Sequence, residues 1–167
     1  MKITLNPRTR ETVRIYFEKA SAPEIKEFLP QKAKTVEEAL ADYEQTLLPG
    51  AASFGQTIYA DGNYVGDVWC YCIDPGDEPN CMVSYCVFDP AYRSKGVATA
   101  ALGQFIRIIR EKFPIQTIGA FTYSRNTASI RVLERCGFSL MEEFEEDGTL
   151  SKYFQYTEGA DANGHHG

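Results

Sequence analysis

The feature that most restricts the fold is an amphipathic helix set between two strand-like segments. Apolar side chains form one stripe along residues 96–113, at the spacing of a helix (Ala98, Leu102, Phe105, Ile109 and Phe113). Pro114 ends this helix. The flanking segments, residues 81–88 and 115–123, have the apolar content of strands. Such a strand–helix–strand unit predicts two parallel strands joined by a right-handed crossover.

The rest of the chain predicts one mixed α/β domain over residues 1–157, with about seven strands and about four helices. Residues 13–18 are predicted to form the first strand. Two helices are expected next, a short one over residues 22–28 and a second one capped by Thr35. The remaining strands are expected at residues 53–60, 64–73, 138–144 and 150–156, the first two joined by a turn at residues 61–63. A fourth helix, over residues 126–136, is closed by Gly137.

Composition excludes some classes of function. The 167 residues carry a net charge of -6, which argues against broad binding to nucleic acid or to anionic membranes. No secretory signal or membrane-spanning run is present, so we expect a cytoplasmic protein. Residues 158–167 are small and polar, which predicts a disordered tail, and its two histidines, His165 and His166, receive no role.

The cysteines leave two interpretations. There are five of them, an odd count that favours reduced thiols. A zinc site made of Cys70, Cys72, Cys81 and Cys86 is one alternative. Buried, inert thiols are favoured over it, because no CxxC pair is present and most of these cysteines lie in apolar strands.

Residues 93–99, Arg-Ser-Lys-Gly-Val-Ala-Thr, lie where the long helix begins. The first amides of a helix have no internal partner, and the helix dipole favours an anion there. Gly96 lets a phosphate approach the backbone, and Arg93 and Lys95 add positive charge. A plain strand-to-helix turn with surface cations is the alternative. Neither a Walker A loop nor a Rossmann glycine pattern is present.

A second segment, residues 126–138, follows the next strand and opens the next helix with the sequence Asn-Thr-Ala-Ser. Alone, Asn126 is a helix cap with Ser129 beside it. Together the two segments resemble the GNAT family of N-acetyltransferases, with its Arg/Gln-x-x-Gly-x-Gly/Ala loop and its Asn-x-x-Ser…Gly-Phe segment. The resemblance covers residues 64–156 well. Within the family, the sequence of residues 126–138 is most similar to the branch of ribosomal-protein N-terminal alanine acetyltransferases. In that branch, residues 11–20 would form the first strand.

The resemblance implies a mostly antiparallel mixed sheet that splays between its fourth and fifth strands. It implies an acetyl-CoA cosubstrate, a primary amine of a small molecule or protein N-terminus as acceptor, direct attack in a ternary complex, and no metal. Dimers are frequent in the family, so a homodimer is allowed. The implied cofactor-binding residues are Cys86, Val87, Phe88, Arg93, Ser94, Lys95, Gly96, Val97, Ala98, Thr99, Asn126 and Ser129.

Two catalytic side chains common in the family are replaced. Met82 stands where a Glu base is usual, and Leu133 stands where a Tyr acid is usual. The resemblance makes Ser129 the candidate acid, with a first-turn helix hydroxyl as the alternative. Candidate bases are Asp67, Tyr85 and Tyr123, each with a structural role as the alternative.

Two other functions stay open, the first of them because of these replacements. One is a CoA-binding module with little catalysis, serving a sensory or assembly role. The other is a nucleotide-phosphate binder that uses the same helix N-terminus.

Overall fold

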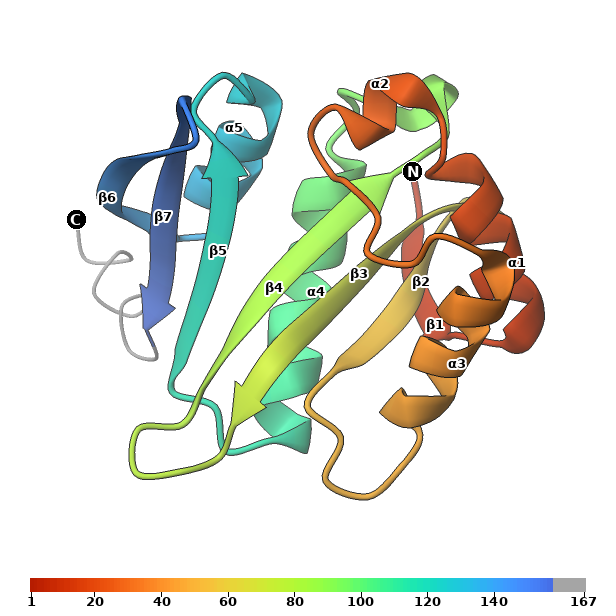
Figure 1. Cartoon of the computed structure of the whole chain (residues 1–167), viewed down its shortest axis with the longest axis horizontal. Helices are drawn as coiled ribbons and strands as arrows, with labels where there is room; N and C mark the ends of the chain where they lie inside the picture. Colours follow the sequence, from red (N-terminus) through yellow and green to blue (C-terminus); the bar gives the residue numbers. More distant parts are fainter. Residues whose placement is uncertain (158–167) are drawn as a thin grey trace.

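The computed structural model describes residues 1–157, which form one seven-stranded sheet with helices on both faces (Figure 1). The strand order is β1-β2-β3-β4-β5-β7-β6, and only β4 and β5 run parallel. The strands are β1 (Ile3–Pro7), β2 (Phe54–Ala60), β3 (Asn63–Asp74), β4 (Asn80–Val87), β5 (Thr117–Tyr123), β6 (Ser139–Glu146) and β7 (Thr149–Thr157). The predicted mixed, mostly antiparallel sheet is confirmed. The predicted tail and its two histidines lie outside the described residues.

Different helices cover the two faces of the sheet. They are α1 (Arg10–Lys19), α2 (Pro23–Lys26), α3 (Val36–Thr46), α4 (Val97–Lys112) and α5 (Thr127–Arg135), and a 3-10 turn, η1 (Pro90–Tyr92), precedes α4. Figure 1 shows α4 and α5 on one face and α1 and α3 on the other. The apolar stripe of α4 explains its place: Leu102 and Phe105 are completely buried in a core that they share with Val68 and Val83.

The prediction for the first segment was wrong. Residues 13–18 belong to α1, and the first strand is β1, which pairs with the far edge of β2. Thr9 starts the helix: its hydroxyl accepts a hydrogen bond from the Thr12 amide at 3.1 Å, and the Thr12 hydroxyl accepts one from the Thr9 amide at 2.8 Å. The same segment gives the chain a fifth helix where four were expected.

The parallel pair β4–β5 is short. Its register covers only Asn80 to Met82 of β4, opposite Thr117 to Gly119 of β5. Beyond that point β4 stays paired with β3, β5 stays paired with β7, and the two strands diverge towards their carboxyl ends (Figure 1). The expected splay between the fourth and fifth strands is therefore present, and it leaves two backbone edges facing each other.

A buried ion pair fixes the chain at the start of α1. The Arg8 Nε donates to Asp67 Oδ2 at 2.9 Å, and the Tyr64 hydroxyl donates to Asp67 Oδ1. The two charged side chains are 17% and 2% exposed. Burial raises the pKa of Asp67, and the Arg8 charge opposes that rise. Arg8 therefore ties the segment between β1 and α1 to the centre of the sheet.

We predict that Arg8→Met costs about 3 kcal/mol in the free energy of unfolding, because it leaves the Asp67 carboxylate buried and uncompensated. The matched control is Arg10→Met, which removes an exposed partner of Glu44 and should cost less than about 1 kcal/mol. Urea titration measures both. Equal losses in the two variants would contradict a special role for the buried pair.

Candidate functional site

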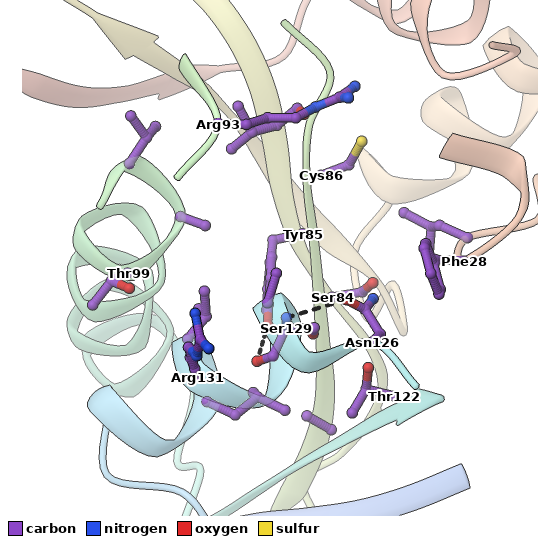
Figure 2. Close-up of a pocket in the computed structure, with 18 of the residues that line it drawn as sticks. Phe28, Ser84, Tyr85, Cys86, Arg93, Thr99, Thr122, Asn126, Ser129 and Arg131 are labelled. Atoms are coloured by element: carbon purple, nitrogen blue, oxygen red, sulfur yellow. Dashed lines mark hydrogen bonds between the residues drawn. The ribbon is translucent and has the colours of Figure 1, made fainter. Parts of the chain in front are cut away.

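A cleft of about 640 Å³ opens where β4 and β5 diverge (Figure 2). Its walls come from β4, β5, the loop before α4, the first turns of α4 and α5, and the short helix α2. Of the residues singled out from the sequence, it is lined by Tyr85, Cys86, Val87, Arg93, Ser94, Gly96, Val97, Ala98, Thr99, Asn126 and Ser129. Segments that lie about forty residues apart in sequence thus meet in one cavity because the crossover brings their strands together.

The end of the cleft at α4 is a helix N-terminus without a side-chain cap. Gly96 is the N-cap, with φ of 79°, and no side chain bonds to the first turn. Ser94 also has a positive φ, 60°. Among the described residues, no hydrogen-bond acceptor is found for the backbone amides of residues 94–99. The other long helices are capped by Thr9, Thr35 and Asn126.

These free amides form a site suited to an anion. They point out of the helix, and the helix dipole places partial positive charge at the same end. The residues around Gly96 leave open space, since a Cβ there would meet nothing within 4 Å. Ser94, Lys95 and Gly96 are exposed, so the loop is accessible. Lys95 does not line the cleft itself.

The Arg93 side chain supplies positive charge and also makes hydrogen bonds to the backbone at the end of β4. Its guanidinium donates to the carbonyl oxygens of Val87 at 3.3 Å and Phe88 at 3.2 Å. It therefore holds the loop against the end of β4. Figure 2 shows Arg93 above Cys86, at the same end of the cleft as the start of α4.

The free edge of β4 offers backbone groups to a ligand. The Phe88 amide donates to the Val65 carbonyl on β3 at 2.9 Å. Neighbouring amides of an extended strand point in opposite directions, so the Val87 amide points to the open edge. Phe88 itself packs on Tyr16 and Tyr64, away from the cleft. Of the three residues expected to supply an amide here, the geometry selects Val87.

Tyr85 and Ser129 meet across the cleft. The Tyr85 hydroxyl lies 2.8 Å from Ser129 Oγ and donates to the Ser129 carbonyl at 3.2 Å (Figure 2). Asn126 Oδ1 accepts from the Ser129 amide at 3.2 Å and so positions the start of α5. Burial raises the pKa of Tyr85, and the bond to Ser129 only partly opposes this. Tyr85 therefore stays protonated near neutral pH and is a hydrogen-bond donor there.

The other two base candidates lie outside the cleft. The Asp67 carboxylate is occupied by Arg8 and Tyr64. The ring of Tyr123 stacks on the Arg125 guanidinium at 5.0 Å. Neither residue lines the cavity.

Several lining residues were not found from the sequence. Glu24, Glu27 and Phe28 come from the segment of α2, and Ser84 and Thr122 come from the diverging strands. Thr122 is 8% exposed, and no hydrogen bond to its hydroxyl is found among the described residues. A hydroxyl at an apolar strand position is a weak sequence signal, and nothing local indicates that α2 reaches the cleft.

The zinc alternative finds no support. Within residues 1–157, no three His, Cys, Asp or Glu side chains lie close enough to hold a metal ion. Cys70, Cys81 and Cys86 are buried, and Cys72 is exposed. Burial raises the pKa of the Cys86 thiol to about 11, so the cleft thiol is protonated near neutral pH.

The family model of the acetyltransferase (GNAT) domain matches residues 2–139. The chain belongs to the GNAT family. A search of curated proteins gave no match. No helix within residues 1–157 has the length and hydropathy needed to cross a membrane.

Solved structures share this GNAT fold at low sequence identity. The spermidine N-acetyltransferase of Vibrio cholerae in complex with CoA and spermine has a TM-score of 0.83 at 16% identity, covering 96% of this chain and 98% of the other. RimL, a ribosomal alpha-N-protein acetyltransferase in complex with CoA, has 0.80 at 18% identity, covering 96% and 97%. The aminoglycoside acetyltransferase AAC(6')-Ib with CoA has 0.79 at 16% identity, covering 97% and 98%.

The two replaced GNAT positions differ in their surroundings. Leu133 is 1% exposed and belongs to the main hydrophobic core, although it reaches the cleft wall. Met82 forms the last parallel pair with Gly119, where a Cβ would lie 2.7 Å from Met82 Sδ. Both side chains are apolar, so neither can transfer a proton.

Proposed function

We propose that the protein is an N-acetyltransferase that transfers the acetyl group of acetyl-CoA to a primary amine within a ternary complex. The observation that carries the proposal is the uncapped N-terminus of α4, which opens directly into the cleft between the diverging strands. The family supports the reaction class. Structural neighbours crystallised with CoA or acetyl-CoA support the cosubstrate.

The residues present fit a CoA molecule along the whole cleft. The free amides of residues 94–99 and Arg93 would hold the diphosphate. The unpaired edge of β4 would pair with the amides of the pantetheine arm, and Asn126 and Ser129 would line its other side. The thioester oxygen would then face the Val87 amide, a donor for the negative charge that develops on it.

The chemistry forms a C–N bond and breaks a C–S bond. The neutral amine attacks the carbonyl carbon, and CoA leaves as a thiolate that takes up a proton. An alkyl ammonium has a pKa near 10.4, so the amine must lose a proton before it attacks. Glu24 and Glu27 are the carboxylates that line the cleft. Asp67 and Tyr123 would have to act through water, since neither lines the cleft.

Ser129 is our candidate for the group that protonates the leaving thiolate, with the Tyr85 hydroxyl behind it as the next donor. Burial keeps Tyr85 protonated near neutral pH, so its proton is present in the cleft, while the raised pKa makes it a weak acid. To replace a proton given by Ser129 Oγ, the Tyr85 hydroxyl would turn from the Ser129 carbonyl to the Oγ, 2.8 Å away, and would regain a proton from solvent. Asn126 fixes the serine through its backbone.

A CoA-binding module with little catalysis is the second candidate. Met82 and Leu133, at the positions of the usual Glu and Tyr, favour it. Thiol release from acetyl-CoA over a panel of amines separates the two functions. Release that depends on an added amine supports the enzyme, whereas CoA binding without such release supports the module.

We predict that Gly96→Asp abolishes the thermal stabilisation by acetyl-CoA. Wild type should gain about 2.7 kcal/mol when the ligand is at about a hundred times its Kd. The aspartate would place a carboxylate where the diphosphate binds. Gly148→Asp is the matched control, because Gly148 also has a positive φ of 80° and open surroundings, but lies in the β6–β7 turn. Absence of stabilisation in wild type, or an equal loss in both variants, would refute the binding mode.

We predict that Ser129→Ala lowers kcat by roughly a hundredfold, with little change in KM for acetyl-CoA, if its hydroxyl protonates the thiolate. Thr127→Ala removes an exposed hydroxyl from the same helix turn and should have no such effect. Steady-state kinetics with thiol detection measures both. A Ser129→Ala enzyme with wild-type kcat would show that this serine only shapes the helix.

A further inference from the structure

The half of the sheet made of β5, β7 and β6 has one face that carries aromatic rings and no helix. Figure 1 shows α5 behind these strands, and the opposite face is free of helices within the part of the chain that the structure describes. Phe121, Tyr153 and Phe144 lie on this free face. The centroids of Phe121 and Tyr153 are 5.0 Å apart, and those of Phe121 and Phe144 are 5.9 Å apart. Phe121 is 55% exposed, a high value for a large apolar ring.

This aromatic face is continuous with the cleft. Phe121 lines the cavity between the diverging strands and is also the central ring of the aromatic group. A molecule whose end enters the cleft over Phe121 would therefore extend across Tyr153. The surface is thus an extension of the site described above.

A carboxylate lies at the far end of the same row. The strand register places Phe121 opposite Tyr153, and Tyr153 opposite Glu142. Two strand spacings separate Phe121 from Glu142, about 10 Å in the plane of the sheet. Glu146 shares the face by alternation, and both glutamates are exposed.

The charges at the two ends of the face differ. On β6 and β7 the only basic residue among residues 139–157 is Lys152, whose register opposite Thr122 and Glu143 puts it on the other face. Near the mouth of the cleft lies Arg125, held between Phe28 at 5.2 Å and Tyr123 at 5.0 Å, with Glu27 at 3.9 Å. Glu27 pairs with Arg125 and Glu24 also lines the cleft, so the charge near the mouth is locally balanced, whereas β6 carries four glutamates and no basic residue and attracts a second ammonium.

The middle of the row suits a methylene chain better than a peptide backbone. Its surface consists of aromatic rings, which offer apolar contact and attract cations weakly over their faces. The Tyr153 hydroxyl already accepts a hydrogen bond from Gln155 Nε2 at 2.9 Å. Peptide groups laid across these rings would lose their bonds to water without replacement.

We propose that Phe121, Tyr153 and Glu142 form the acceptor surface for a linear polyamine. One amine enters the cleft, the methylene chain crosses the rings, and a second ammonium lies against Glu142. This assignment names the acceptor class of the proposed acetyltransferase and so rests on that function. Phe144 and Glu146 border the same path.

The test is a chain-length series of α,ω-diamines, from diaminopropane to diaminododecane, each compared with the monoamine of equal length and acetyl-CoA at saturation. We expect kcat/KM for diamines to rise with length until the second ammonium reaches Glu142. Glu142→Gln should lower kcat/KM by about fivefold for the best diamine and leave the monoamine unchanged. Glu145→Gln is the matched control, because Glu145 is exposed on the same strand but points to the other face.

The outcomes separate the two proposals. If monoamines and diamines react alike, and Glu142→Gln equals Glu145→Gln, the polyamine surface is refuted while the acetyltransferase stands. If no amine releases CoA and acetyl-CoA does not stabilise the protein, the proposed function itself fails. Sedimentation of the full chain gives a further check: a dimer that Phe121→Ala dissociates would show that a second copy covers the face, and would overturn the assignment.

Discussion

The divergence of β4 from β5 after three paired residues on each strand is the constraint on which the site depends. Neither strand can bend back to close the gap, because β4 is held by β3 as far as Val87 and β5 by β7 as far as Tyr123. Their facing edges carry backbone donors and acceptors that need partners, from a ligand or from water. The same crossover makes α4 begin at the carboxyl end of β4. Free amides of a helix and free edges of strands thus come from one topological unit.

Local geometry explains how an acidic chain can offer an anion site. The net charge of -6 is spread over the surface, whereas the amides of residues 94–99 act at hydrogen-bond distance. Five acidic residues and one lysine lie among residues 139–157, none of which lines the cleft. The anion site and this acidic segment therefore lie in different parts of the molecule. In the proposed reaction, a polyanionic cosubstrate and a cationic acceptor can approach from different directions, because each is attracted by a different region of the surface.

Local patterns were enough to predict most elements and the helix start at Gly96 that opens into the cleft. Helix α4, its start at Gly96 and the cap Asn126 each depend on residues adjacent in sequence. The prediction of a strand over residues 13–18 failed because Val13, Ile15 and Phe17 alternate as apolar residues do in a strand. The Thr9–Thr12 capping interaction instead stabilises a helix. The contribution of the α2 segment to the cleft was not predictable from local patterns. Glu27 and Phe28 line the cleft beside β4, although nearly sixty residues separate them from Tyr85 and Cys86 in sequence.

The floor of the opening shows why the usual carboxylate base cannot simply be replaced by a neighbour. Met82 and Gly119 form the last pair before the strands separate, and a Cβ on Gly119 would lie 2.7 Å from Met82 Sδ and 2.8 Å from the Tyr153 hydroxyl. A thioether and a ring therefore fill the space beneath the acceptor. Neither Met82 nor Gly119 lines the cleft, and both are apolar, so this pair offers no group that could accept a proton. In the proposed acetyltransferase, the proton of the amine would leave towards Glu24 and Glu27, which line the cleft, and an acceptor that arrives partly deprotonated would react most readily.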